Sequence, residues 1–152
     1  MALRIILFLL INFAALGIGS FFTGDGVVSD WYLNLNKAPW TPPGWVFGAA
    51  WTTIMICFSI YMAFAWDSVK NRNTLLVLFA IQWVLNVGWN PIFFNLRNVP
   101  VGLVVITALT ILMIYFLFRY WSTLKSKSLL VLPYCIWLVI ATSLNAYVLF
   151  NN

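Results

Sequence analysis

The sequence predicts an all-α membrane protein built as a bundle of five transmembrane helices. Of its 152 residues, 64% are hydrophobic and only 7% are charged, whereas soluble domains carry roughly 25% charged residues. Five apolar stretches are each long enough to cross a hydrocarbon core of about 30 Å at about 1.5 Å per residue. None has the alternation over about ten residues that is typical of membrane β-strands.

The helices are expected in one domain covering residues 1–152, at 5–22, 44–66, 74–94, 99–118 and 128–150. The first stretch follows Arg4 as a signal peptide would, but it continues without charge to Phe22, which is long for such a segment. After it, Thr23-Gly24-Asp25-Gly26 is interpreted as a turn that opens the longest loop.

That loop runs to about Pro43, where the second helix is expected to begin. Thr41 can cap this helix, and Pro42 and Pro43 fit its first positions because those N–H groups have no helical partner. Polar segments at 67–73, 95–98 and 119–127 separate the other helices.

The cations predict the orientation. Six lie on the side of the amino terminus and two, Lys37 and Arg97, on the other. The six are Arg4, Lys70, Arg72, Arg119, Lys125 and Lys127. This bias predicts a cytoplasmic amino terminus and an external carboxyl terminus. The short termini, without a clear presequence, favour a bacterial plasma membrane.

Nine tryptophans form two groups. Those near helix ends or in the first loop are typical of an interfacial aromatic belt: Trp31, Trp40, Trp45, Trp66 and Trp121. Those placed deeper need helix packing or a ligand to explain them: Trp51, Trp83, Trp89 and Trp137.

Several polar residues share helix faces with the deep tryptophans. The third helix presents Gln82, Asn86, Trp89 and Phe93. The fifth presents Tyr134, Trp137, Ala141 and Asn145. The first presents Asn12, Ala15 and Gly19, and the second a mostly apolar stripe of Phe47, Trp51, Met55, Phe58 and Met62. Amides in lipid need partners, so these faces should turn inward. The amides could bond helix to helix, or they could line a cavity.

A cavity with tryptophan walls and a few amides suits a flat, largely apolar molecule, such as a tetrapyrrole or a sterol. No Asp, Glu, Lys, Arg or His lies within a predicted span, which argues against a proton-coupled pump. With no histidine and three acidic residues, the chain offers no metal site and no conventional acid–base pair. Cys57 and Cys135 lie in apolar runs and are interpreted as packing residues. No basic cluster indicates a nucleic-acid partner.

Three sets of residues, in order along nearly the whole chain, resemble the TspO/MBR family of tryptophan-rich sensory proteins, which includes the mitochondrial translocator protein. The first loop contributes Trp31-Tyr32-Leu33-Asn34-Leu35-Asn36-Lys37, Trp40-Thr41-Pro42-Pro43-Gly44 and Trp51-Thr52. The third helix contributes Gln82, Leu85-Asn86, Trp89, Pro91 and Phe93-Phe94. The fifth contributes Pro133-Tyr134, Trp137, Ala141-Thr142 and Leu144-Asn145.

The resemblance implies a bundle of five helices, often a homodimer, whose first loop acts as a lid on a pocket. It implies a membrane receptor or carrier for porphyrins, with roles in stress or light signalling, transport or tetrapyrrole handling. Other implied ligands are isoquinoline or benzodiazepine drugs and, in some members, sterols. The resemblance implies porphyrin as ligand or substrate and no covalently bound cofactor. The expected binding residues are Tyr32, Pro42, Trp51, Met55, Gln82, Asn86, Trp89, Trp137, Ala141 and Leu144.

The alternative function is enzymatic: light- and oxygen-dependent degradation of bound porphyrin, with Trp51 and Trp137 as the catalytic residues. Two departures from the family pattern stand out. The loop reads Lys37-Ala38-Pro39-Trp40, with the proline displaced by one position. No basic residue follows Tyr147, although the cholesterol motif of the animal proteins requires one. A third interpretation is that the aromatic core only packs.

Overall fold

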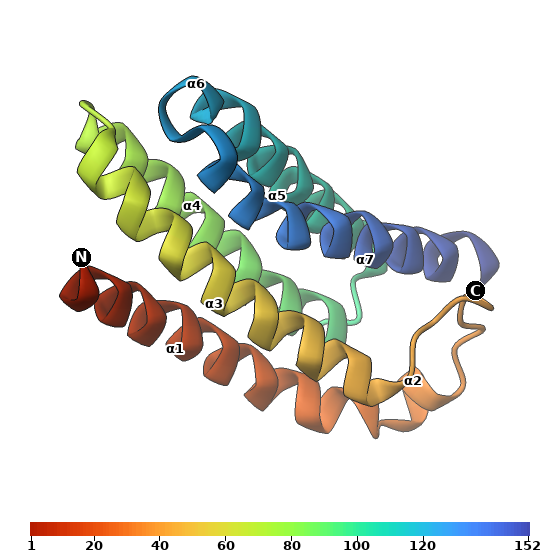
Figure 1. Cartoon of the computed structure of the whole chain (residues 1–152). Helices are drawn as coiled ribbons and strands as arrows, with labels where there is room; N and C mark the ends of the chain where they lie inside the picture. The colour runs from red at the N-terminus through yellow and green to blue at the C-terminus, as the bar shows by residue number, and fades with distance from the viewer.

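The computed structural model describes residues 1–152 and consists of helices and their connections (Figure 1). Five stretches are long and apolar enough to cross a membrane, which confirms the predicted fold class. The long helices are α1 (Ala2–Val27), α3 (Gly44–Ser68), α4 (Arg72–Asn90), α5 (Val99–Arg119) and α7 (Leu132–Asn151). Shorter elements connect or extend them: α2 (Asp30–Leu33), the π-helix η1 (Pro91–Asn95), α6 (Trp121–Leu124) and the 3₁₀-helix η2 (Lys125–Val131).

The five long helices form a closed ring. Along the ring, α1 packs against α3, α3 against α7, α7 against α5, α5 against α4, and α4 against α1. The amino terminus, the α3–α4 link and α6 lie at one end of the bundle, while α2 and the carboxyl terminus lie at the other (Figure 1). The two ends therefore separate the six cations from Lys37 and Arg97, as expected.

Side-chain caps explain where several helices begin. Ser29 Oγ accepts from the Tyr32 N–H at α2, and Asn71 and Asn98 cap α4 and α5 in the same way. Thr41 does not cap α3, contrary to expectation: its hydroxyl donates to the Ala38 carbonyl at 2.7 Å, and Pro43 takes the N-cap position without a side-chain bond.

The first helix is longer than predicted, because the expected turn at Thr23–Gly26 is helical and α1 continues to Val27. The glycines here do not break the helix, which is packed against η1 at Gly26. Gly26 lies directly against Phe94: a Cβ added at Gly26 would be 2.3 Å from Phe94 Cδ1. Tertiary packing thus outweighs the turn propensity of the local sequence.

Pro91 produces the π-helix that follows α4. Proline has no N–H to donate within a helix, and the chain continues with wider turns, in which the Leu96 N–H donates to the Pro91 carbonyl at 2.9 Å. Two consecutive aromatic side chains, Phe93 and Phe94, are both buried there. Such π segments often mark functional sites.

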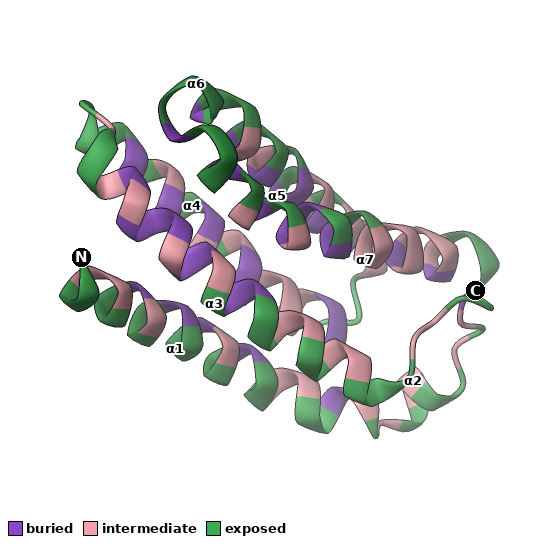
Figure 2. Ribbon diagram, viewed as in Figure 1, coloured by how far each residue is buried: buried purple, intermediate pink, exposed green.

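The predicted inward faces are confirmed (Figure 2). Asn12, Gln82, Asn86 and Asn145 are all buried. The half of the bundle near the amino terminus is filled by a dense aromatic core of Phe58, Tyr61, Phe79, Phe116 and Tyr134. The other half encloses a cavity.

Candidate ligand-binding site

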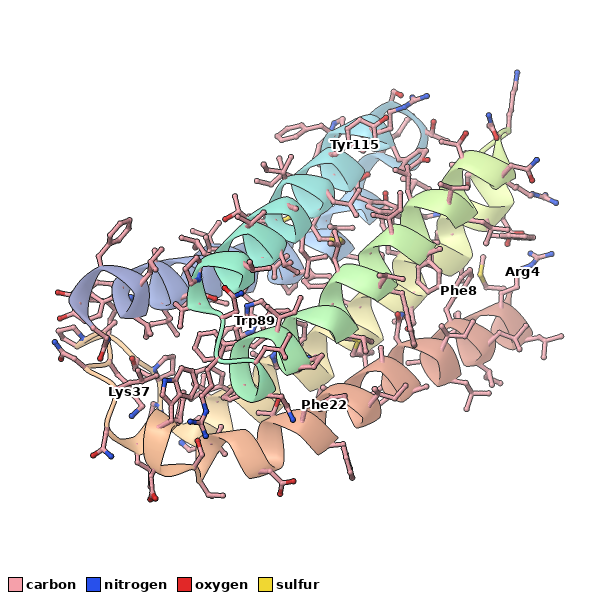
Figure 3. The ribbon with its side chains drawn as sticks, turned by 180° about the vertical axis from the view of Figure 1, so that it is seen from behind. Arg4, Phe8, Phe22, Lys37, Trp89 and Tyr115 are labelled. Atoms are coloured by element: carbon pink, nitrogen blue, oxygen red, sulfur yellow. The ribbon has the colours of Figure 1, made fainter.

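A cavity of about 770 Å³ lies between α1, α3, α4, η1, α7 and the first loop. This volume falls within the range of about 300–1,000 Å³ that is typical of small-molecule sites. Figure 3 shows Lys37 and Trp89 toward the end of the molecule that holds the cavity, and Arg4 and Phe8 toward the other. Met55 lines the cavity, is fully buried and also belongs to the hydrophobic core. It therefore marks the boundary between the cavity and the core.

One wall of the cavity is aromatic and comes from the end of α4 and from η1. The Trp89 ring stacks on Phe93 with centroids 4.9 Å apart, and Phe94 meets Trp89 edge-on at 5.8 Å. Tyr32 from the loop packs against Phe94 at 5.5 Å. Because both phenylalanines of η1 face inward, the π-helix is what makes this wall continuous.

Asn145 fixes that wall to the neighbouring helices. Its Oδ1 accepts from Trp89 Nε1 at 3.1 Å, and its Nδ2 donates to the Val99 carbonyl at 3.1 Å. Gly102 allows the close approach, since a Cβ there would lie 3.2 Å from Asn145 Oδ1. The helix-to-helix bonds expected of the buried amides are therefore present at Asn145, which also lines the cavity.

A second polar group joins α1 to α4. Thr23 Oγ1 donates to Asn90 Oδ1 at 2.8 Å, and Asn90 Nδ2 donates to the Asn86 carbonyl at 3.2 Å. Gly19 makes room for this amide, because a Cβ at Gly19 would lie 2.7 Å from Asn90 Nδ2. All four residues line the cavity.

The α3 side contributes Phe47, Trp51 and Met55. Trp51 packs edge-on against Tyr134, with centroids 5.8 Å apart, and so contacts both the cavity and the aromatic core. Some of the deep tryptophans therefore line a cavity, while others pack helices together. Trp51 and Trp89 line the cavity, whereas Trp83 donates its N–H to the Ile11 carbonyl at 3.1 Å and packs helices.

The first loop covers one end of the cavity, as a lid would. Tyr32, Lys37, Ala38, Thr41 and Pro42 line it from this side. Burial raises the pKa of the Tyr32 hydroxyl above its ordinary value, so Tyr32 is a neutral hydrogen-bonding group at neutral pH. At the displaced proline of the loop, Ala38 is buried while Pro39 is exposed.

Two sets of contacts anchor the loop to α7 and to Asn152, the residue that follows it. Trp40 Nε1 donates to Ser143 Oγ at 3.1 Å, and its ring packs edge-on against Tyr147 at 5.4 Å. The Asn36 N–H donates to Asn152 Oδ1 at 2.7 Å, and Asn152 Nδ2 donates back to the Asn36 carbonyl at 3.2 Å. Trp40 therefore belongs to the loop anchor and not only to an interfacial belt.

The structure brings all but two of the expected binding residues to this one cavity. Those that line it are Tyr32, Pro42, Trp51, Met55, Asn86, Trp89, Ala141 and Leu144. Gln82 lies outside, because it sits one turn deeper than Asn86, fully buried, and donates to the Tyr134 hydroxyl at 2.8 Å.

Trp137 also lies outside the cavity. Phe47, which does line it, packs edge-on against Trp137 at 5.2 Å. The Trp137 indole N–H is buried and has no hydrogen-bond partner. Trp137 therefore meets the cavity through its contact with Phe47 and does not line it.

Sequence reasoning missed several cavity residues, among them Thr23, Lys37, Asn90 and Phe94. Asn90 follows Asn86 by four residues, so the helical spacing used for the face could have found it. Lys37 belongs to the loop motif and to the charge bias, but neither pattern predicts that it faces the cavity. Thr23 was assigned to a turn, and no local signal shows that α1 continues past it.

The arrangement can bind but offers little for acid–base chemistry. Aromatic rings, amides and hydroxyls form the walls, and no acidic residue or histidine is among the lining residues. A flat apolar molecule would stack on the Trp89 wall, while Asn86 and Asn145 would orient any polar edge.

The chain matches the model of the TspO/MBR family over residues 6–150. It is 36% identical over 155 residues to the tryptophan-rich protein TspO of Chlorobaculum tepidum, covering 100% of this chain and 95% of that protein. It is 39% identical over 128 residues to TspO of Archaeoglobus fulgidus, covering 84% and 82% of the two chains. It is 29% identical over 140 residues to the human translocator protein, covering 89% and 82%.

Proposed function

Because the chain belongs to the TspO/MBR family and is an integral membrane protein, we propose that it is a receptor or carrier for porphyrins. Related flat, apolar molecules would bind in the same cavity. The proposed roles are stress or light signalling, transport, or tetrapyrrole handling.

One observation carries this proposal: the cavity combines a continuous aromatic wall with a small number of polar groups. Trp89, Phe93 and Phe94 offer ring surface to a planar molecule. Asn86 and Asn145 supply amides at that wall. Apolar linings with a few placed polar groups are the usual design of small-molecule sites.

Tryptophan fluorescence tests the proposal. Purified protein is titrated with protoporphyrin in the dark, and saturable quenching is expected. Trp51→Phe should weaken the quenching, because Trp51 lines the cavity. Trp121→Phe is the matched control, since Trp121 is exposed at the opposite end of the bundle.

Ligand-dependent melting distinguishes binding from an aromatic core that only packs. A ligand that binds the folded state raises the melting temperature as its concentration rises. A well-folded sample with neither saturable quenching nor a shift in melting temperature would contradict the receptor proposal. It would leave packing as the explanation for the tryptophans.

The alternative proposal is light- and oxygen-dependent oxidation of the bound porphyrin, with Trp51 and Trp137 as redox partners. The position of Trp51 at the cavity supports it, as does the aromatic contact from Phe47 to Trp137. The test is to look for a new absorbing product that forms only in light. This product should not form in the double variant Trp51→Phe, Trp137→Phe. Equal bleaching by that double variant, or by porphyrin in empty detergent, would contradict it.

Assembly and orientation are part of the same proposal. Family membership supports a homodimer, which sedimentation in detergent would measure. The separation of Arg4, Lys70 and Arg72 from Lys37 and Arg97 supports a cytoplasmic amino terminus. The membrane proposed is a bacterial plasma membrane. Reporter fusions at the two termini would test this orientation, and activity of an externally active reporter at the amino terminus would contradict it.

A further inference from the structure

Lys37 is the single charged side chain among the residues that line the cavity. Lys37 forms no salt bridge: no acidic residue lines the cavity, and the ion pair of the molecule, Arg4 with Asp67, lies at the other end. An ammonium group at the rim of an apolar site attracts an anion more strongly than one in bulk water, because the local dielectric is lower.

The position of this charge is defined by its surroundings. Lys37 Nζ lies 4.6 Å from the centroid of the Tyr32 ring, and its one polar contact is a long one, 3.4 Å from the Leu33 carbonyl oxygen. The backbone beside it is held by the paired bonds between Asn36 and Asn152. Tyr32 in turn packs on Phe94 of the aromatic wall. The cation therefore stands at the edge of the surface on which a flat molecule would stack.

We propose that Lys37 makes the cavity selective for flat apolar molecules that carry a carboxylate. The ring system would stack on the Trp89 wall, and the carboxylate would accept a charge-assisted hydrogen bond from Lys37 Nζ at the loop. A neutral molecule of the same shape fits the cavity but leaves the ammonium without an anion. This inference rests on the proposed function and adds its ligand class.

The test compares protoporphyrin, a dicarboxylic acid, with its dimethyl ester. Both are titrated in the dark, in a neutral detergent without anionic lipid, by tryptophan quenching. For each variant the quantity is the ratio of acid affinity to ester affinity, with each affinity referred to the ligand concentration outside the detergent micelles. Comparing this ratio between variants cancels any remaining partition, which is the same for every variant. Lys37→Met removes the charge and keeps an apolar stem, while Lys37→Arg keeps the charge. Two control variants each remove one charge outside the cavity. Lys70→Met does so at the end of the bundle opposite Lys37, and Arg97→Met does so at the same end as Lys37.

In wild-type protein the acid should bind more tightly than the ester. Lys37→Met should lower the ratio about tenfold, the loss that one hydrogen bond to a charged group produces. Lys37→Arg should retain most of the preference, and the two control variants should leave the ratio unchanged.

Three outcomes would overturn the inference. Equal affinities of acid and ester for wild type, or equal loss of both in Lys37→Met, would leave the receptor function intact but remove the role of Lys37. An added anionic phospholipid that abolishes the preference of the wild type would reassign the cation to a lipid headgroup. Binding of neither porphyrin by well-folded protein would overturn the proposed function together with this inference.

Discussion

The bond between Trp89 and Asn145 offers a direct test of how the cavity wall is held. Asn145→Ala removes both the acceptor for Trp89 Nε1 and the donor to the Val99 carbonyl, each at 3.1 Å. Trp89→Phe removes the indole N–H but keeps a ring that can stack on Phe93. The two single variants and the double variant form a thermodynamic cycle that isolates the shared bond.

The magnitude follows from the setting of this bond. Polar contacts between membrane helices average about 0.6 kcal/mol and reach about 1.7 kcal/mol. Asn145 is only 2% exposed, and its bond to Trp89 joins two helices inside the bundle, so the same range applies to it. We therefore expect the double variant to be more stable than the sum of the single effects predicts, by about 0.6–1.7 kcal/mol.

The free energy of unfolding is measured by titrating protein in mild detergent with a denaturing detergent. Asn145→Ala combined with Trp83→Phe is the control cycle, because the Trp83 N–H bonds to the Ile11 carbonyl and not to Asn145. The control pair should be additive within about 0.3–0.5 kcal/mol. Additivity of the Trp89 pair as well would refute the view that Asn145 holds the wall.

Three further predictions concern α1 and the loop. Gly26→Ala should lower the free energy of unfolding by roughly 1–3 kcal/mol, because the new Cβ would lie 2.3 Å from Phe94 Cδ1; unchanged thermal stability in detergent would show that α1 can shift without cost. Burial raises the pKa of Tyr32, so its phenolate absorbance, wild type minus Tyr32→Phe, should emerge above the ordinary midpoint of about 10. As pH rises, Tyr32 ionises at a lower pH in the unfolded chain than in the folded protein. The stability that Tyr32 contributes is therefore complete below the ordinary midpoint and is lost as pH rises above it. A midpoint at or below about 10 would count against burial of this hydroxyl. Asn152→Ala should speed deuterium exchange at the Asn36 amide, which loses its 2.7 Å acceptor, and exchange at wild-type rate would show that this pair does not anchor the loop.

The inward faces of the helices were predictable because lipid leaves buried amides no alternative partner. Asn12 and Asn86 fall on helical spacing with small or aromatic residues, and both are buried. The same spacing brought Trp51, Met55 and Trp89 to one cavity. Periodicity therefore determined which residues face inward, although it could not say how far along the bundle the cavity extends.

The parts that sequence reasoning could not supply depend on contacts between distant segments. Gly26 remains helical because Phe94 packs on it. Trp137 shares a helix face with Ala141, but it packs against Phe47 of α3 and does not line the cavity. The loop anchor at Asn36 involves a residue 116 positions away. Such pairings have no local signature, so a single sequence leaves them open.

The middle turns of α7 perform two tasks at once. Ala141, Leu144 and Asn145 form cavity wall, while Ser143, on the same turns, anchors the loop through Trp40. A tilt of this one helix would widen the interior and release the cover in a single movement. Widening of the cavity and release of the loop would then occur at one shared rate rather than at two separate rates, with α7 as the moving element.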